Sequence, residues 1–140
     1  MQMVDPLKDD SKTYDSEQTL EDVQRRAEAS DCDIIWGAPN RLTLDLDVAK
    51  YPTASQVYDD VFKVLQPLYP LRAIDRYTSR GGVGTHVVLQ LDGVRLSSLE
   101  RCGLQAILGS DPMREALCVR RIGNTTFPDP CILFKPRSVR

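Results

Sequence analysis

Two aspartates, Asp45 and Asp47, stand two residues apart in a stretch that alternates strictly between apolar and other side chains. The stretch is Arg-Leu-Thr-Leu-Asp-Leu-Asp-Val, from Arg41 to Val48, and this period is typical of a half-buried β-strand. Both carboxylates then lie on one face of a sheet, about 7 Å apart. They repel unless a cation lies between them, and carboxylate oxygens are ligands that Mg²⁺ and Mn²⁺ prefer. The alternative is a solvent-exposed sheet face without a ligand.

A glycine-rich segment and the single histidine form a second candidate group. The segment runs Ser79-Arg-Gly-Gly-Val-Gly-Thr-His86 and leads into another alternating stretch over 85–91. Its backbone N–H groups, its hydroxyls and the Arg80 guanidinium are suited to binding an anion. His86 is suited to contacting a phosphate or orienting a nucleotide. A simple hairpin turn explains the glycines equally well.

Asp111 is a third candidate, and two interpretations of it stay open. It directly precedes Pro112, so it fits the N-cap of a helix that begins there. It also fits a third metal ligand beside the two earlier aspartates. Arg114 and Lys135 follow near enough in the sequence to supply phosphate contacts, although exposed basic side chains are usually only solvated.

The composition is that of an ordinary globular domain. The 140 residues fit one domain, and 18 basic and 20 acidic side chains leave a net charge of −2. This balance does not indicate nucleic-acid binding, although local charge matters more than the sum. The sequence has no apolar run of transmembrane length and no signal-peptide core, so we expect a cytoplasmic protein, in the host cytoplasm if it is viral. The four cysteines lack metal-site spacing, and we expect reduced thiols without zinc.

Periodicity and capping signals predict the elements that must position these residues. We expect helices over 19–29, 53–68, 97–108 and 112–121 and strands over 42–48, 71–79, 85–91 and 131–135, with 31–36 a strand or a docking segment. The order from 42 onward predicts an α+β fold, a ferredoxin-like or RNA-recognition-like split βαβ antiparallel sheet with helices on one face. The strand order of that plan is 4-1-3-2, so Asp45, Asp47 and His86 meet on the open face.

The chain divides on this basis into three parts. Residues 1–40 are an N-terminal extension with a short helix, 41–136 are the α+β core and 137–140 are a basic tail.

Three motifs in the core resemble, in order, those of the archaeo-eukaryotic primase superfamily, especially the small primase–polymerase proteins of phages and plasmids. They are Asp-Leu-Asp at 45–47, the loop that runs from Ser79 to His86 and leads into an apolar strand, and Gly109-Ser-Asp111. The resemblance covers about 42–136, and the catalytic core of that family is an RNA-recognition-like sheet. The larger amino-terminal module, zinc-binding stem and helicase domain of the family have no counterpart here.

The resemblance implies a nucleotidyltransferase of the primase or DNA polymerase type that acts in replication. Asp45, Asp47 and Asp111 would bind Mg²⁺ or Mn²⁺ and would be catalytic together with His86. The implied nucleotide contacts are Ser79, Arg80, His86, Arg114 and Lys135. The implied partners are nucleoside triphosphates, a DNA or RNA template or primer, and a helicase or other replication protein.

Two other function classes stay open. The first is a non-catalytic RNA-recognition-like interaction module. Such sheets usually bind bases through aromatic side chains, and the outward positions of the strands at 42–48 and 85–91 carry none, so a protein partner is favoured over nucleic acid. The second is a small metal-dependent nuclease that uses the same carboxylates.

Overall fold

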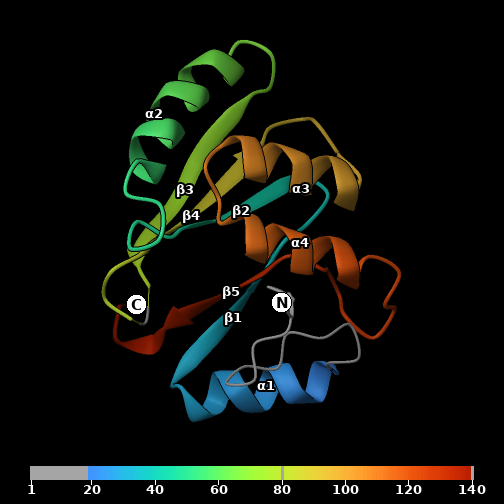
Figure 1. Cartoon of the computed structure of the whole chain (residues 1–140). Coiled ribbons are helices and arrows are strands. Elements are labelled where there is room, and N and C mark those ends of the chain that lie inside the picture. Colours follow the sequence, from blue (N-terminus) through green and yellow to red (C-terminus); the bar gives the residue numbers. More distant parts are fainter. Residues whose placement is uncertain (1–18, 80, 140) are drawn as a thin grey trace, which may run out of the picture.

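The computed structural model describes residues 19–79 and 81–139, and over this part the chain is α+β. Four α-helices surround two antiparallel sheets (Figure 1). The helices are α1 (Leu20–Ala29), α2 (Ala54–Leu65), α3 (Ser98–Ile107) and α4 (Pro112–Arg121). Among the described residues, none of these helices has the length and apolar character needed to span a membrane.

The strands form one sheet of three and one sheet of two. In the first, β4 (Thr85–Leu91) lies between β2 (Arg41–Leu46) and β3 (Leu71–Thr78). In the second, β1 (Cys32–Trp36) pairs with β5 (Ile132–Pro136). The predicted α+β class and the predicted neighbours of the central strand β4 are confirmed.

The main core lies between the three-stranded sheet and helices α2 and α3. Alternation along β2 turns Leu42, Leu44 and Leu46 to this side, and all three are completely buried. They pack with Tyr58 of α2 and with Leu108, which follows α3. Helices therefore cover one face of this sheet, as the sequence predicts.

Helix α2 buries a different stripe from the one that its apolar spacing predicts, which is Val57, Val61, Val64, Leu65 and Leu68. Ala54 and Tyr58 are buried, whereas Val64 and Leu68 expose 69% and 72% of their surface. The helix also ends at Leu65, so Leu68 lies beyond it. Apolar residues occupy more than one face of this helix, and periodicity alone does not say which face meets the sheet.

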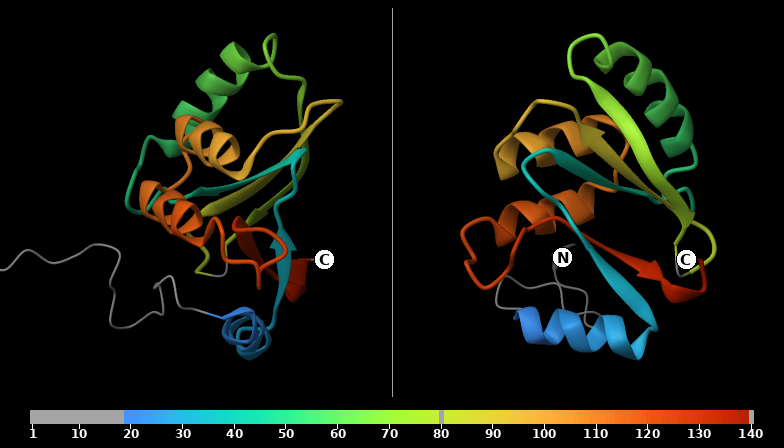
Figure 2. Two further views of the ribbon diagram at one scale, coloured as in Figure 1. Left: turned by 90° about the vertical axis from the view of Figure 1, so that its right-hand side faces the viewer. Right: turned by 180° about the vertical axis from the view of Figure 1, so that it is seen from behind.

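A second core joins α1 to the two-stranded sheet, at the opposite end of the molecule from α2 (Figure 2). Val23 of α1 packs with Phe127 and Ile132. A capping box between Thr19 and Asp22 begins α1, as this pair of residue types favours. Because β1 pairs with β5, residues before 41 contact the end of the core that the sequence predicts over 41–136. The predicted boundary between extension and core at residue 40 stays a prediction.

The segment after β5 is anchored to the first part of the chain. The 3-10 helix η1 (Arg137–Val139) follows the strand directly. The Arg137 guanidinium pairs with Glu28, Asp31 and Asp33 at 2.8–3.3 Å, and its backbone N–H donates to the Asp31 carbonyl at 3.0 Å. The predicted basic tail therefore begins with a residue fixed by three acidic partners.

The outer edge of β2 departs from the predicted plan. The order 4-1-3-2 would pair this edge with the last strand, but β5 pairs with β1 instead, so that part of the prediction is wrong. Side chains take the place of the missing strand. The Thr43 N–H donates to Gln105 Oε1 at 3.0 Å, and the Asp45 N–H donates to Ser110 Oγ at 2.9 Å.

The carbonyl groups on the same edge also have partners from the α3–α4 region. The Thr43 carbonyl accepts from the Arg114 guanidinium at 2.5 Å. The Asp45 carbonyl accepts from the Asp111 N–H at 2.7 Å. Because buried backbone groups must be hydrogen-bonded, an edge that is satisfied in this way does not need another strand. Figure 1 shows α3 and α4 side by side next to β2.

A buried carboxylate holds these partner side chains together. Glu115 Oε1 accepts from Gln105 Nε2 at 2.7 Å, and Oε2 accepts from Ser110 Oγ at 2.7 Å and from Arg114 Nη1 at 2.6 Å. Glu115 is 4% exposed. One network therefore fixes the three side chains that bond to the edge of β2.

The second face of the three-stranded sheet is covered, whereas the predicted plan leaves it open. Thr43 and Val88 point away from the main core by alternation, and both are buried. The two-stranded sheet reaches this face at both sides. The Lys135 ammonium of β5 lies 2.7 Å from Asp75 Oδ2 on β3, and the Arg114 guanidinium bonds both Thr43 and the Ile132 carbonyl.

All four cysteines are buried. Cys102, Cys118 and Cys131 form a small cluster of their own, where α3, α4 and the start of β5 meet. Their burial makes them part of the packing between these elements.

We predict that Ser110→Ala lowers the free energy of unfolding by about 2 kcal/mol, because it leaves the Asp45 N–H buried without an acceptor. Urea unfolding followed by circular dichroism measures this change. Ser138→Ala, at an exposed position, is the matched control and should stay within about 0.5 kcal/mol of wild type. An equally small effect at Ser110 would mean that water replaces the hydroxyl.

Candidate functional site

Asp45, His86 and Tyr77 form one row across the three-stranded sheet. His86 of β4 faces Asp45 of β2 on one side and Tyr77 of β3 on the other. The Asp45 Oδ1 and His86 Nε2 atoms are 3.5 Å apart. The Tyr77 and His86 rings meet edge to face with centroids 5.2 Å apart. The predicted meeting of Asp45 and His86 is therefore present.

The surroundings of Asp45 favour its ionised form. Burial raises the pKa of this carboxyl, but the hydrogen bond with His86 and the positive charges of Arg114 and Lys50 outweigh burial. The net result is a pKa below the ordinary value of an aspartate. The side chain is 26% exposed, so a ligand from solvent can reach it.

Asp47 does not share the strand face with Asp45, and that expectation is wrong. Strand β2 ends at Leu46, and a turn follows in which the Tyr51 N–H donates to the Asp47 carbonyl at 2.8 Å. The Asp47 Oδ1 atom accepts from the Lys50 N–H at 3.2 Å. The alternation of the sequence continues past the point where the backbone leaves the sheet.

Asp111 is the N-cap of α4, as one of its two interpretations predicts. Its Oδ1 accepts from the Met113 N–H at 3.0 Å. Its own N–H bonds to the carbonyl of Asp45, which places the backbone of the third motif next to that of the first. The cap does not use Oδ2, and this atom accepts from the Lys50 ammonium at 3.2 Å.

Lys50 supplies the cation among these carboxylates. Its Nζ lies 3.2 Å from Asp111 Oδ2 and 4.0 Å from Asp47 Oδ2, and its charge also acts on Asp45. Burial lowers the pKa of the ammonium, but the contacts with Asp111 and Asp47 raise this pKa by more than burial lowers it, so the net shift is upward. Lys50 is not among the site residues predicted from the sequence. The pattern that points to it is a basic residue three positions after Asp47, just beyond a strand.

The donor atoms of this group fit a hard divalent cation, since all three predicted ligands are carboxylates and an ammonium already lies among them. Their arrangement is not that of a finished metal site. Over residues 19–79 and 81–139, no three or more His, Cys, Asp or Glu side chains are grouped so that they could hold a metal. Lys50 would have to leave before the carboxylates could share a metal.

The glycine-rich loop closes the hairpin between β3 and β4. The Ser79 N–H donates to the Gly84 carbonyl at 2.8 Å, and Ser79 Oγ accepts from the Gly84 N–H at 3.1 Å. A Cβ on Gly84 would lie 3.3 Å from the Leu46 carbonyl, so the loop lies against the end of β2, next to Asp47. Arg80, a predicted phosphate contact, lies outside the described residues.

The other two predicted phosphate contacts have partners inside the protein. Both terminal nitrogens of Arg114 bond to Thr43, Glu115 or Ile132, which makes Arg114 part of the scaffold around β2. The Lys135 ammonium pairs with Asp75 and lies 5.3 Å from the centroid of the Tyr77 ring. In this arrangement neither cation is directed to the carboxylate group.

Two buried polar atoms in the central row have no hydrogen-bond partner. They are His86 Nδ1 and the Tyr77 hydroxyl, on residues that are 9% and 7% exposed. Burial and the charge of Asp75 raise the pKa of Tyr77 well above that of a free tyrosine. The sequence analysis did not single out Tyr77, which its register with His86 brings into the site.

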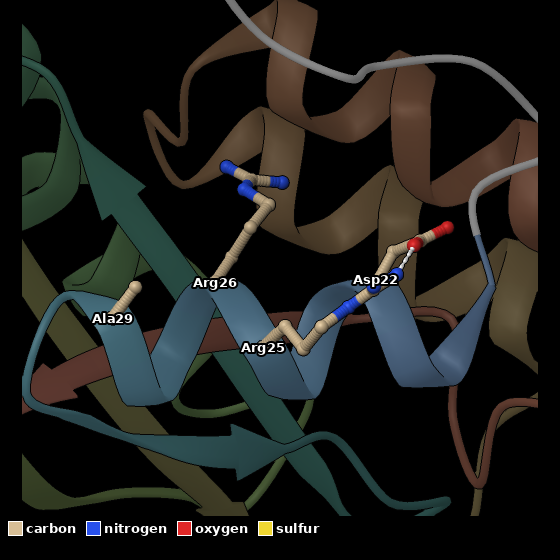
Figure 3. Close-up of a pocket in the computed structure, with 4 residues that line it drawn as sticks. All are labelled: Asp22, Arg25, Arg26 and Ala29. Atoms are coloured by element: carbon tan, nitrogen blue, oxygen red, sulfur yellow. Dashed lines mark hydrogen bonds and ion pairs between the residues drawn. The ribbon is translucent and has the colours of Figure 1, made fainter.

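A surface cavity of 380 Å³ lies elsewhere, along α1. Its lining residues are Asp22, Arg25, Arg26 and Ala29. Figure 3 shows the ion pair between Arg25 and Asp22, and Arg26 extending away from the helix. None of the predicted site residues lines this cavity.

Comparisons with known proteins identify no relative. No family model, curated protein or solved structure matches the chain. The resemblance to primases accordingly remains an expectation from the motifs.

We predict a pH-dependent cost for Asp45→Asn. Because the folded pKa of Asp45 lies below the unfolded one, its carboxylate stabilises the fold above the unfolded value of 3.8, and this contribution disappears as the pH falls through the folded pKa. The variant should therefore be less stable than wild type by about 1 kcal/mol at pH 6, as expected for a partly exposed ion pair.

The difference should shrink toward zero at pH 3, which urea unfolding at the two pH values measures. Asp59→Asn, exposed on α2, controls for the loss of one charge. A deficit that stays constant between pH 6 and pH 3 would show that the cost of Asp45→Asn is steric rather than electrostatic.

Proposed function

We propose that this chain is the core of a metal-dependent nucleotidyltransferase of the primase–polymerase type. One observation carries the proposal. Two of the three aspartates that the motifs single out, Asp47 and Asp111, pair with one cation, Lys50, and the third, Asp45, bonds through its backbone carbonyl to the Asp111 N–H. Carboxylates that already pair with a positive charge are suited to a divalent metal.

In this proposal Asp45, Asp47 and Asp111 hold Mg²⁺ or Mn²⁺. When bound, the metal would supply the positive charge that stabilises a transferring phosphoryl group and the departing pyrophosphate. His86 orients the Asp45 carboxylate through their 3.5 Å contact. Ser79 lies in the loop against the end of β2, where its hydroxyl accepts from the Gly84 N–H, and in this proposal it lies beside the nucleotide phosphates. Arg114 and Lys135 bond to groups inside the protein and are not among the proposed nucleotide contacts.

The substrates would be nucleoside triphosphates and a DNA or RNA template or primer, and a helicase or other replication protein would be the partner. The covered second face of the three-stranded sheet argues against nucleic acid lying across that face. A template strand would instead approach the end of β2 and the loop over 79–84, where the carboxylates lie.

A protein-interaction module without catalysis is the second candidate, and a specific observation favours it. Val64 at the end of α2 and Leu68 just beyond it are large apolar side chains with most of their surface exposed, and exposed apolar surface is commonly used to bind a partner. In this candidate Lys50 is the permanent counter-ion of the carboxylates, and no metal binds.

Calorimetric titration with Mn²⁺ distinguishes the two candidates. The nucleotidyltransferase proposal expects wild type to bind Mn²⁺, and to bind it more tightly when a nucleoside triphosphate is present. Asp45→Asn with Asp47→Asn should weaken binding beyond the roughly 10- to 100-fold that loss of a supporting residue costs a metal site. Primer extension with the same variants measures the activity.

The matched control is Asp59→Asn with Asp60→Asn, which removes two exposed carboxylates of α2 and should bind Mn²⁺ like wild type. If wild type binds neither Mn²⁺ nor nucleotide, the proposal is wrong and the interaction module takes its place.

A further inference from the structure

Three of the four cysteines meet in one buried cluster. Cys102 lies on α3, Cys118 on α4 and Cys131 directly before β5, and their exposed fractions are 3%, 0% and 0%. The sulfur atoms of Cys102 and Cys131 are 3.8 Å apart, which is close to van der Waals contact. A disulfide bond is about 2 Å long, so these two atoms need only a small further approach, which rotation of two short side chains can provide.

A buried ion pair holds these two cysteines in place. Arg101, the residue before Cys102, donates to the two carboxylate oxygens of Asp129 at 3.0 and 2.8 Å. Asp129 Oδ1 also accepts from the Cys131 N–H at 2.9 Å, and the Gly37 N–H donates to the Cys131 carbonyl at 2.7 Å. The backbone is therefore fixed beside both sulfur atoms, so their proximity is a property of the fold.

The surroundings of Cys131 favour its thiolate, which is the form that reacts with oxidants. Hydrogen bonds with Cys102 and Cys118 lower its pKa, and together with the positive charge of Arg114 they outweigh burial, which raises it. Gln105 Nε2 also donates to the Cys131 sulfur at 3.6 Å. The hydrogen bond with Cys118 lowers the pKa of Cys102, but contact with Cys131 and burial raise it by more. One nucleophilic sulfur therefore lies next to a protonated thiol.

We propose that Cys102 and Cys131 form a reversible disulfide bond when hydrogen peroxide oxidises the protein. This modification goes beyond the proposed function and does not depend on it. Both sulfur atoms are almost fully buried, and hydrogen peroxide suits them because its molecule is little larger than water.

The oxidation takes place in two steps. The Cys131 thiolate attacks one oxygen of hydrogen peroxide, the O–O bond breaks, and Cys131 becomes a sulfenic acid. The departing hydroxide takes up the proton that the Cys131 thiol lost and becomes water. The Cys102 sulfur then attacks the Cys131 sulfur, the S–O bond breaks, and the proton of Cys102 leaves in a second water molecule. Peroxide is reduced to water, and two thiols are oxidised to one disulfide.

The disulfide would join the two cores of the molecule. Cys102 belongs to α3, which covers the three-stranded sheet, whereas Cys131 directly precedes β5 of the two-stranded sheet. The two cysteines are 29 positions apart in the sequence. A cross-link over that length restricts the unfolded chain and so stabilises the folded one.

Peroxide treatment of the folded full-length chain, followed by peptide mapping, tests the proposal. Remaining thiols are blocked after oxidation, and trypsin, which cleaves after arginine and lysine, then places the four cysteines on separate peptides. We expect one linked pair of peptides that contains Cys102 and Cys131, and a reductant should restore both thiols. A link through Cys118 or Cys32 in place of this pair would overturn the proposal. Loss of thiols to sulfinic or sulfonic acid without a linked peptide would overturn it as well.

Single substitutions provide matched controls. Cys32→Ala removes a buried cysteine of β1 outside the cluster and should form the link at the rate of wild type. Cys118→Ala should still form it, but more slowly, because Cys131 loses a hydrogen bond that favours its thiolate. Cys131→Ala should form no link. A bond between Cys102 and Cys118 that forms in Cys131→Ala as fast as the wild-type link would contradict the role of Cys131 as the nucleophile.

A thermal melt of oxidised and reduced wild type measures whether the link fits the fold. This comparison needs no substitution, so it holds even if a variant does not fold. The oxidised protein should melt about 10 °C above the reduced one, because the unfolded chain is cross-linked. An oxidised protein that melts at or below the reduced one would overturn the proposal, since the bond would then distort the native packing.

Discussion

The outer edge of β2 is the constraint on which the rest of the structure depends. Its backbone groups at Thr43 and Asp45 bond to side chains and to one N–H from the α3–α4 region rather than to a neighbouring strand. An unpaired sheet edge is a liability that must be covered, and here the cover also serves the site. The bond between the Asp111 N–H and the Asp45 carbonyl brings the last motif to the first, so one backbone contact both closes the edge and joins the two motifs.

Charge balance explains how three carboxylates can lie close together without unfolding the turn after β2. Asp45 has His86 at 3.5 Å, and Asp111 has Lys50 at 3.2 Å. Asp47 is closer to solvent and shares Lys50 at 4.0 Å. Lys50 projects from the turn after β2 with a side chain that is 47% exposed, so it serves as the counter-ion of Asp111 and Asp47 at the margin of the fold rather than in its core.

Local signals predicted the elements well, and the features they missed depend on long-range pairing. The leucines of β2, the capping box of α3 and the N-cap at Asp111 follow from residue types within a few positions, and the structure contains all of them. The pairing of β5 with β1 depends on the edge of β2 already being occupied, which no local pattern reveals. Asp47 does not lie on the same sheet face as Asp45, because the backbone turns away from the sheet before the alternation of apolar and polar residues ends. Lys50 and Tyr77 acquire their positions only through the three-dimensional register.

The covered second face changes where a ligand can bind. A split βαβ sheet with one open face offers its whole surface to a single strand of nucleic acid, but here β5 crosses that surface and Lys135 joins it to β3 through Asp75. The exposed polar groups that remain lie at the end of β2 and in the adjoining loop, which Gly84 holds against the Leu46 carbonyl. Under the proposed function, a nucleotide would therefore bind at the end of β2 and the adjoining loop, and an extended strand of nucleic acid would not lie across the covered face.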